Sequence, residues 1–85
     1  MDEDFSNFQV TNRESFARFL ESLGEDLKVN KQSWENKTLE DFLEAMSRYV
    51  EDIQGYYDNT GEKTDANNPS WKLFADIFNG AKIYE

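Results

Sequence analysis

Residues 69–81 read PSWKLFADIFNGA, and this stretch predicts the central helix of the protein. Asn68 can cap such a helix, and Pro69 suits its first position, where a missing N–H does no harm. Gly80 is expected near its end, with residues 81–84 as a last turn or an extended tail on the core. The apolar side chains would cover about 200° of the helix surface, which indicates contact from two sides. These side chains are Trp71, Leu73, Phe74, Ala75, Ile77, Phe78 and Ala81.

An amphipathic helix is predicted over residues 12–28. Thr11 and Glu14 have the spacing of a capping box at its start. Gly24 lies at the edge of the apolar face, where it either admits a neighbouring helix or weakens its own. The apolar face falls within about 100° and comprises Phe16, Phe19, Leu20, Leu23 and Leu27.

A second amphipathic helix is predicted over residues 39–54. Thr38 and Asp41 resemble a capping box, and Gly55 is a plausible stop. One face is apolar and comprises Leu39, Phe42, Leu43, Met46, Tyr49, Val50 and Ile53. The opposite face is acidic and comprises Glu40, Asp41, Glu44, Glu51 and Asp52, with Arg48 as its one cation.

These elements predict an all-α fold, a small three-helix bundle that forms a single domain over residues 1–85. Residues 56–68 are rich in turn formers and are expected to form a long loop. Residues 1–10 are expected to form a packed N-terminal arm, and the C-terminal tail to close another side. If Trp71 is fully buried, Trp71→Ala should cost about 3–5 kcal/mol.

The composition excludes several classes of protein chemistry. The chain of 85 residues has no histidine and no cysteine. Without imidazole or thiol it has no Ser-His or Cys-His nucleophile, no ordinary zinc site and no disulfide framework. Seven phenylalanines, four tyrosines and two tryptophans must therefore supply most of the core. We expect no metal and no cofactor.

Carboxylates remain as candidate chemistry, in two arrangements. The loop from Asp58 superficially resembles a calcium-binding loop, but glycine falls at its fourth position and Pro69 at its twelfth, so the EF-hand pattern fails. Catalysis by paired carboxylates needs a cleft that raises the pKa of one of them. The clustered acids are expected on the solvent side of a helix, so the protein is predicted not to be an enzyme.

The formal net charge of −9 favours a basic protein partner. Nucleic acid and anionic membranes would be repelled. The chain begins Met1-Asp2-Glu3-Asp4, the opposite of a signal peptide's basic start, and it contains no apolar run that could span a bilayer. We therefore expect a cytoplasmic protein. Its oligomeric state does not follow from the sequence.

The most distinctive predicted surface is the acidic row Glu40, Glu44 and Glu51, which falls within about 40° on the second helix. It is either a docking site for a basic protein or an ordinary solvated face. Of the pair Tyr56 and Tyr57, one should continue the core and the other should be free to contact a partner.

Trp34 stands in a polar stretch just before the second helix. It is either an exposed contact residue or a side chain that folds back onto the core. The core interpretation is favoured, because tryptophans in this position usually act as a hydrophobic staple.

Two stretches carry a family resemblance: WENKTLEDFLEA at 34–45, and PSWKLFADI at 69–77 with GAKIYE at 80–85. They resemble a family of small, uncharacterised, acidic bacterial proteins. The likeness covers nearly the whole chain, including Gly55, Tyr56 and Tyr57. It implies a stand-alone bacterial cytoplasmic protein, and it carries no known activity or catalytic residues.

The leading functional hypothesis is a non-catalytic, acidic protein-binding module. Its sharpest form is an immunity-type inhibitor of a basic toxin, an analogy from size, charge and class. Its binding residues would be Glu40, Glu44 and Glu51, with Tyr56 and Tyr57 as aromatic contacts. The alternatives are an acidic nucleic-acid mimic and a structural adaptor or homo-oligomer.

Overall fold

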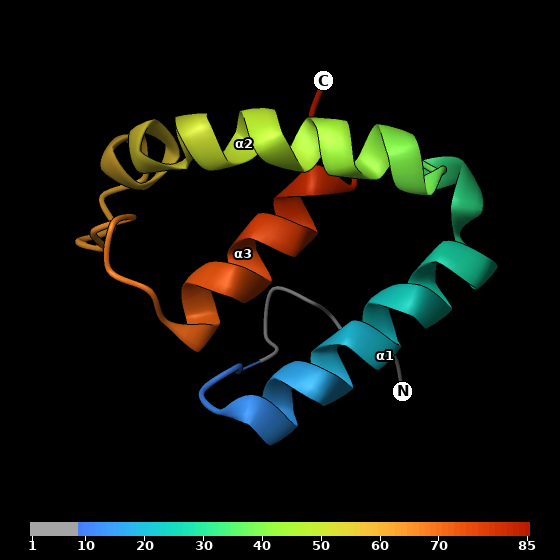
Figure 1. Ribbon diagram of the computed structural model, residues 1–85, viewed down its shortest axis with the longest axis horizontal. Coiled ribbons are helices and arrows are strands. Elements are labelled where there is room, and N and C mark those ends of the chain that lie inside the picture. The colour runs from blue at the N-terminus through green and yellow to red at the C-terminus, as the bar shows by residue number, and fades with distance from the viewer. Residues whose placement is uncertain (1–8) are drawn as a thin grey trace.

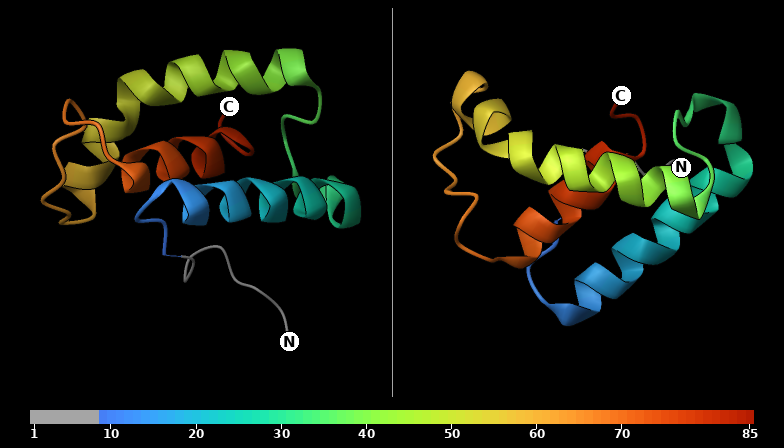
Figure 2. Two further views of the ribbon diagram at one scale, coloured as in Figure 1. Left: turned by 60° about the horizontal axis from the view of Figure 1, so that its bottom comes forward. Right: turned by 45° about the horizontal axis from the view of Figure 1, so that its top comes forward.

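The computed structural model of the protein describes residues 9–85. The elements are α1 (Arg13–Val29), the short 3₁₀ helix η2 (Lys31–Ser33), α2 (Leu39–Asn59) and α3 (Trp71–Ala81). α3 lies between α1 and α2, and each of them packs against it (Figures 1 and 2). The predicted all-α, three-helix bundle is confirmed. Of the predicted arm only Gln9 and Val10 are described, and Val10 is buried in the core.

α1 begins with a capping box one residue later than the sequence suggested. The Asn12 side chain accepts a hydrogen bond from the Ser15 backbone N–H at 2.8 Å, and Ser15 Oγ accepts one from the Asn12 N–H at 3.0 Å. The predicted Thr11–Glu14 box is therefore wrong. Asn is as good an N-cap as Thr, and a serine hydroxyl at the third helical position closes the box in place of a carboxylate.

α2 begins as predicted and ends later than predicted. The Thr38 hydroxyl accepts a hydrogen bond from the Asp41 N–H at 3.1 Å, which confirms this cap. The predicted stop at Gly55 is wrong, because the helix runs on to Asn59 and the chain turns at Gly61, whose φ is +79°. A glycine inside a helix costs about 1 kcal/mol, which burial of the Tyr57 ring in the next turn outweighs.

α3 is capped by Ser70, whose hydroxyl accepts a hydrogen bond from the Leu73 N–H at 3.0 Å. The predicted cap at Asn68 with Pro69 as the first helical residue is therefore wrong. The Asn68 N–H instead donates to the Asp65 carbonyl at 3.0 Å, in a turn before the helix. The helix ends at Ala81, one residue beyond Gly80.

The core confirms that α3 is contacted from two sides. Ala75 belongs to a cluster with residues of α1, whereas Leu73 belongs to a cluster with Ile53 and Tyr57 of α2. Trp71, however, is 36% exposed and packs at the rim against Phe16, with ring centroids 5.5 Å apart. The condition of full burial is therefore not met, and Trp71→Ala should cost less than 3–5 kcal/mol.

The inward face of α2 is turned relative to its predicted apolar arc. Ala45 and Ile53 are buried, whereas Leu39, Leu43 and Val50 are 73%, 53% and 46% exposed. The physical reason is size, since small residues allow helices to approach closely. Ala45 of α2 is fully buried. The Tyr49 ring of α2 occupies the space where a side chain at Gly80 of α3 would begin, so even a Cβ would not fit there.

The C-terminal tail packs on the segment before α2, a partner that the sequence did not predict. The backbone N–H groups of Glu35 and Asn36 both donate to the Lys82 carbonyl, at 3.0 and 3.1 Å. The Asn36 side-chain amide donates to the carbonyls of Ala81 and Tyr84, at 2.9 and 2.8 Å. The two stretches that carry the family resemblance therefore bind each other in space.

Candidate functional site

The outer face of α2 carries the predicted acidic row. Glu40, Glu44 and Glu51 are all exposed, and they lie within one narrow arc of the helix. Further exposed acids widen this face: Asp41, Asp52 and Asp58. α2 therefore presents six carboxylates and one arginine, Arg48, to solvent.

An apolar row runs beside the acidic row. It consists of the exposed residues Leu39, Leu43 and Val50, which the sequence had placed in the core. At 100° per residue these side chains lie between the buried face and the glutamates. An apolar strip with charged side chains along its edge is the arrangement found in protein interfaces. The sequence did not predict an apolar row beside the acidic row, because its periodicity placed Leu39, Leu43 and Val50 in the core.

A groove of about 300 Å³ between α1 and α2 continues this apolar row. Leu39 borders it from α2, Leu20 and Leu27 from α1, and Trp34 from the connection between them. A Cβ added at Gly24 would meet no described atom within 4 Å. Gly24 therefore opens the groove, and the interpretation that it admits a close helix is wrong.

The tyrosine pair divides as predicted. Tyr56 is 52% exposed, whereas Tyr57 is 1% exposed and belongs to the core. Tyr57 is too deeply buried for the predicted contact with a partner, so that part of the prediction is corrected. Tyr56 lies about 160° around α2 from Glu40, so the structure does not place it in the acidic row.

A second hollow, which we call the tyrosine pocket, was not expected from the sequence. It has a volume of about 470 Å³ and lies between the second half of α2, the following loop, α3 and the tail. Tyr49, Tyr56 and Tyr84 contribute aromatic side chains to its wall, and Glu62, Asp76 and Glu85 contribute carboxylates. The clustered acids of α2 lie on its solvent side as expected, and the sequence did not predict this pocket with its three other acids.

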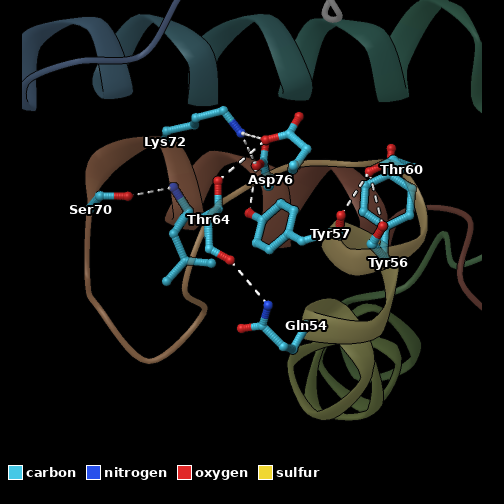
Figure 3. A network of polar contacts seen from close by, with 10 residues as sticks. Gln54, Tyr56, Tyr57, Thr60, Thr64, Ser70, Lys72 and Asp76 are labelled. Carbon is cyan, nitrogen blue, oxygen red and sulfur yellow. Dashed lines mark hydrogen bonds and ion pairs between the residues drawn. The ribbon is translucent and has the colours of Figure 1, made fainter.

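A polar network forms the inner wall of the tyrosine pocket (Figure 3). The Tyr57 hydroxyl donates to Asp76 Oδ2 at 2.6 Å, and Lys72 Nζ donates to the same oxygen at 2.8 Å. Lys72 also pairs with Glu62 at 3.5 Å and lies 5.3 Å from the centroid of the Tyr57 ring. The wall thus already holds one cation between an aromatic ring and two carboxylates.

The acids of this network help to raise the pKa values of Tyr57 and Lys72. Burial raises the pKa of Tyr57, and its hydrogen bond to Asp76 and the negative charges of Asp76 and Glu62 raise it further. Burial lowers the pKa of Lys72, but the hydrogen bond to Asp76 and the charges of Asp76 and Glu62 outweigh that effect and raise it. The contributions of Asp76 and Glu62 to both shifts indicate a negative electrostatic potential in the pocket.

Gln54 fixes the loop that brings Glu62 to the pocket. Its side-chain oxygen accepts a hydrogen bond from the Ala66 N–H at 2.7 Å. Its amide nitrogen donates to the Thr64 carbonyl at 3.1 Å (Figure 3). The Glu62 N–H in turn donates to the Tyr57 carbonyl at 2.9 Å. A loop with these contacts is part of the folded unit, although its composition indicated only turns.

A separate polar centre at Asp26 joins α1 to the tail. Asp26 accepts hydrogen bonds from the Trp34 indole at 2.8 Å, from Asn30 at 2.8 Å and from Lys82 at 3.1 Å. Burial raises the pKa of Asp26, but these three donors and the charge of Lys82 together lower it below its usual range. Trp34 is 4% exposed, which confirms its place in the core.

Neither hollow offers an obvious reaction centre. In the described part of the chain no group of three or more carboxylates is arranged to hold a metal ion. Asp76 is already engaged by Tyr57 and Lys72, and the groove beside α2 is almost wholly apolar. The absence of enzymatic activity stays a prediction.

Lys72, Asp76 and Asn79 are the polar residues of α3 in the pocket, and the sequence analysis missed them because it considered α3 only for its apolar side chains. One signal could have found Asp76: Lys72 and Asp76 are four residues apart on one helix, the spacing of an ion pair.

Comparison with known proteins places the chain in a family without assigning a function. None of the described helices is both long and apolar enough to cross a membrane. No curated protein and no solved structure matches the chain. One family model, described as a family of unknown function (DUF7660), matches residues 12–85. The chain belongs to this family, which confirms the resemblance to an uncharacterised group of small proteins.

Proposed function

We propose that the protein is a non-catalytic binding module that docks a basic protein on the outer face of α2. The observation that supports this most directly is the apolar row Leu39, Leu43 and Val50, exposed beside the acidic row Glu40, Glu44 and Glu51. Apolar contact would supply affinity, and the carboxylates would supply attraction and specificity.

The groove beside Leu39 supports the same proposal. It offers about 300 Å³ of apolar space in which a partner could bury a large side chain. Anchors of that kind dominate the binding energy of protein interfaces. A partner that combines a basic surface with one apolar anchor fits both the charge and the shape of this face.

The sharpest form of the proposal is an immunity-type protein that neutralises a basic toxin in the cytoplasm of a bacterium. Its support is the net charge of −9, the absence of cysteine and the resemblance to small, acidic bacterial proteins. Such a protein would bind its toxin tightly and would need no catalytic residue of its own.

Affinity capture from the cell that encodes the protein tests the proposal. The variant Glu40→Lys/Glu44→Lys/Glu51→Lys should lose the specific partner. The variant Glu14→Lys/Glu21→Lys/Glu25→Lys, on exposed positions of α1, should keep it. Both variants change the net charge equally, so equal loss in both would reject the α2 face as the site. With the purified partner, an affinity that does not fall with added salt would reject electrostatic attraction.

A second candidate is a homo-oligomer that buries the apolar row against a second copy. The exposure of Leu43 and Val50 favours it, whereas the acidic row opposes it, because two copies would repel each other. Sedimentation equilibrium decides: a dimer that Leu43→Lys converts to a monomer would support this candidate against the first.

A further inference from the structure

The tyrosine pocket combines two features that are used to bind organic cations in proteins. Its wall includes Tyr49 and Tyr84, whose ring centroids are 5.0 Å apart with the ring planes at 64°. Two rings at a steep angle form a corner of aromatic surface, and a cation is attracted to the face of such rings. Tyr84 is held in place by a hydrogen bond from its hydroxyl to Asp52.

The charges around the pocket also favour a cation. Three carboxylates border it, from Glu62, Asp76 and Glu85, against the single ammonium of Lys72. Lys72 shows that a cation is stable here, since it lies over the Tyr57 ring and pairs with Asp76. An anion would meet the excess of negative charge, and a neutral apolar ligand would gain nothing from it.

Asn79 supplies an uncommitted polar group. It lines the pocket, and its Oδ1 is enclosed without a hydrogen-bond partner among the described residues. Enclosing a carbonyl oxygen without a donor is unfavourable. A ligand N–H reached by rotation of this side chain would relieve that cost, and guanidinium and alkylammonium groups carry such donors.

We propose that the tyrosine pocket binds an organic cation, a guanidinium or alkylammonium group, between the rings of Tyr49, Tyr56 and Tyr84. The cation could be the arginine or lysine side chain of a protein partner or a free small amine. The first source rests on the proposed function, because a basic partner has such side chains on its surface. The binding of the cation itself does not depend on that function.

Titration of the isotope-labelled protein, followed by NMR, tests the proposal. The probes are tert-butylammonium and N-acetyl-arginine methylamide, with neutral tert-butanol and acetate as controls. Both cations should shift the signals of Tyr49, Gly80 and Tyr84, with dissociation constants on the order of 1–10 mM. Saturation by tert-butanol at the same concentration, or competition by acetate, would overturn the proposal.

Two variants of Tyr56 make the test specific. Tyr56 is 52% exposed, so its replacement should leave the fold intact. Tyr56→Leu removes an aromatic wall and should weaken cation binding at least about threefold, whereas Tyr56→Phe keeps the ring and should bind within about twofold of the original. Equal binding by the leucine variant would overturn the role of the ring.

The two sources of the cation are separated by a further comparison. If spermidine or putrescine binds at least tenfold more tightly than the arginine amide, the ligand is a free amine; otherwise it is a protein side chain. Cation binding by the charge-reversed α2 variant is compared with that of the charge-matched α1 variant. Equal binding in both, together with loss of partner capture only in the α2 variant, shows that the pocket and the docking face are separate sites. If the capture experiment shows no role for the α2 face, the measured binding of cations to the tyrosine pocket is therefore unaffected.

Discussion

The ring of Tyr49 in α2 lies directly against the backbone of Gly80 in α3. A Cβ built on Gly80 would overlap three carbon atoms of that ring. This contact fixes how closely the two helices cross, and it forms one edge of the tyrosine pocket. The absence of a side chain at Gly80 is therefore a requirement of the fold.

Gly80→Ala should destabilise the protein by about 1–3 kcal/mol, because the added methyl group forces the helices apart. Gly24→Ala is the matched control: it also lies inside a helix, its Cβ would meet open space, and it should be neutral or stabilise by up to about 1 kcal/mol. Urea unfolding followed by tryptophan fluorescence measures both. In a Tyr49→Ala background the cost of Gly80→Ala should largely disappear, and an unchanged cost would contradict the contact.

Leu43 and Ile53 should differ sharply in their contribution to stability, although their sequence pattern places both in the core. Ile53→Ala should cost about 2–5 kcal/mol, since Ile53 is 1% exposed. Leu43→Ala should cost less than about 0.5 kcal/mol, since Leu43 is 53% exposed. Similar losses in the two variants would show that α2 is rotated differently.

Tyr57→Phe should destabilise the protein by about 1–3 kcal/mol near neutral pH, because Asp76 loses a buried donor. The folded-state pKa of Tyr57 is raised, so the unfolded chain releases this proton first, and stability falls as the pH rises above about 10. Urea unfolding at pH 9 and pH 11 should show a smaller fall for Tyr57→Phe than for the original chain. The exposed Tyr56→Phe serves as control, and an equal fall in all three proteins would count against the Asp76 hydrogen bond.

Asp26→Asn should cost about 1–3 kcal/mol at pH 7, because the carboxylate joins Trp34, Asn30 and Lys82. The pKa of Asp26 is lowered in the folded state, so its stabilisation is present above about pH 4 and is lost as the pH falls through the folded-state pKa. Thermal unfolding from pH 6 to pH 3 should therefore show a flatter profile for the variant. A parallel profile would mean that Asp26 is not the group responsible.

The fold was predictable from the sequence because its three helices carry strong apolar periodicity and recognisable caps. The exact cap residues were not predictable, because neighbouring polar residues cap a helix almost equally well. Asn12 caps α1 in place of the predicted Thr11, and Ser70 caps α3 in place of the predicted Asn68. The rotation of α2 could not be predicted, since it depends on how closely α2 approaches α3, where the Tyr49 ring lies against Gly80.

The acidic row was predictable as a surface, and the tyrosine pocket was not. Glu40, Glu44 and Glu51 share a face of one helix, so the 3.6-residue period alone places them together. The pocket joins residues from α2, a loop, α3 and the tail, and local periodicity carries no information about such distant contacts. The exposure of Leu39, Leu43 and Val50 was not predictable for the same reason, because it depends on how α2 packs against distant parts of the chain.

The most direct test of the proposed docking face is NMR mapping with the purified partner. The 85-residue chain is labelled with nitrogen-15, and its backbone amide signals are followed as the partner is added. The largest changes should lie at Leu39, Glu40, Leu43, Glu44 and Val50, with α1 positions such as Glu14 little affected. Changes concentrated on the exposed side of α1, with these five residues unchanged, would contradict the proposal.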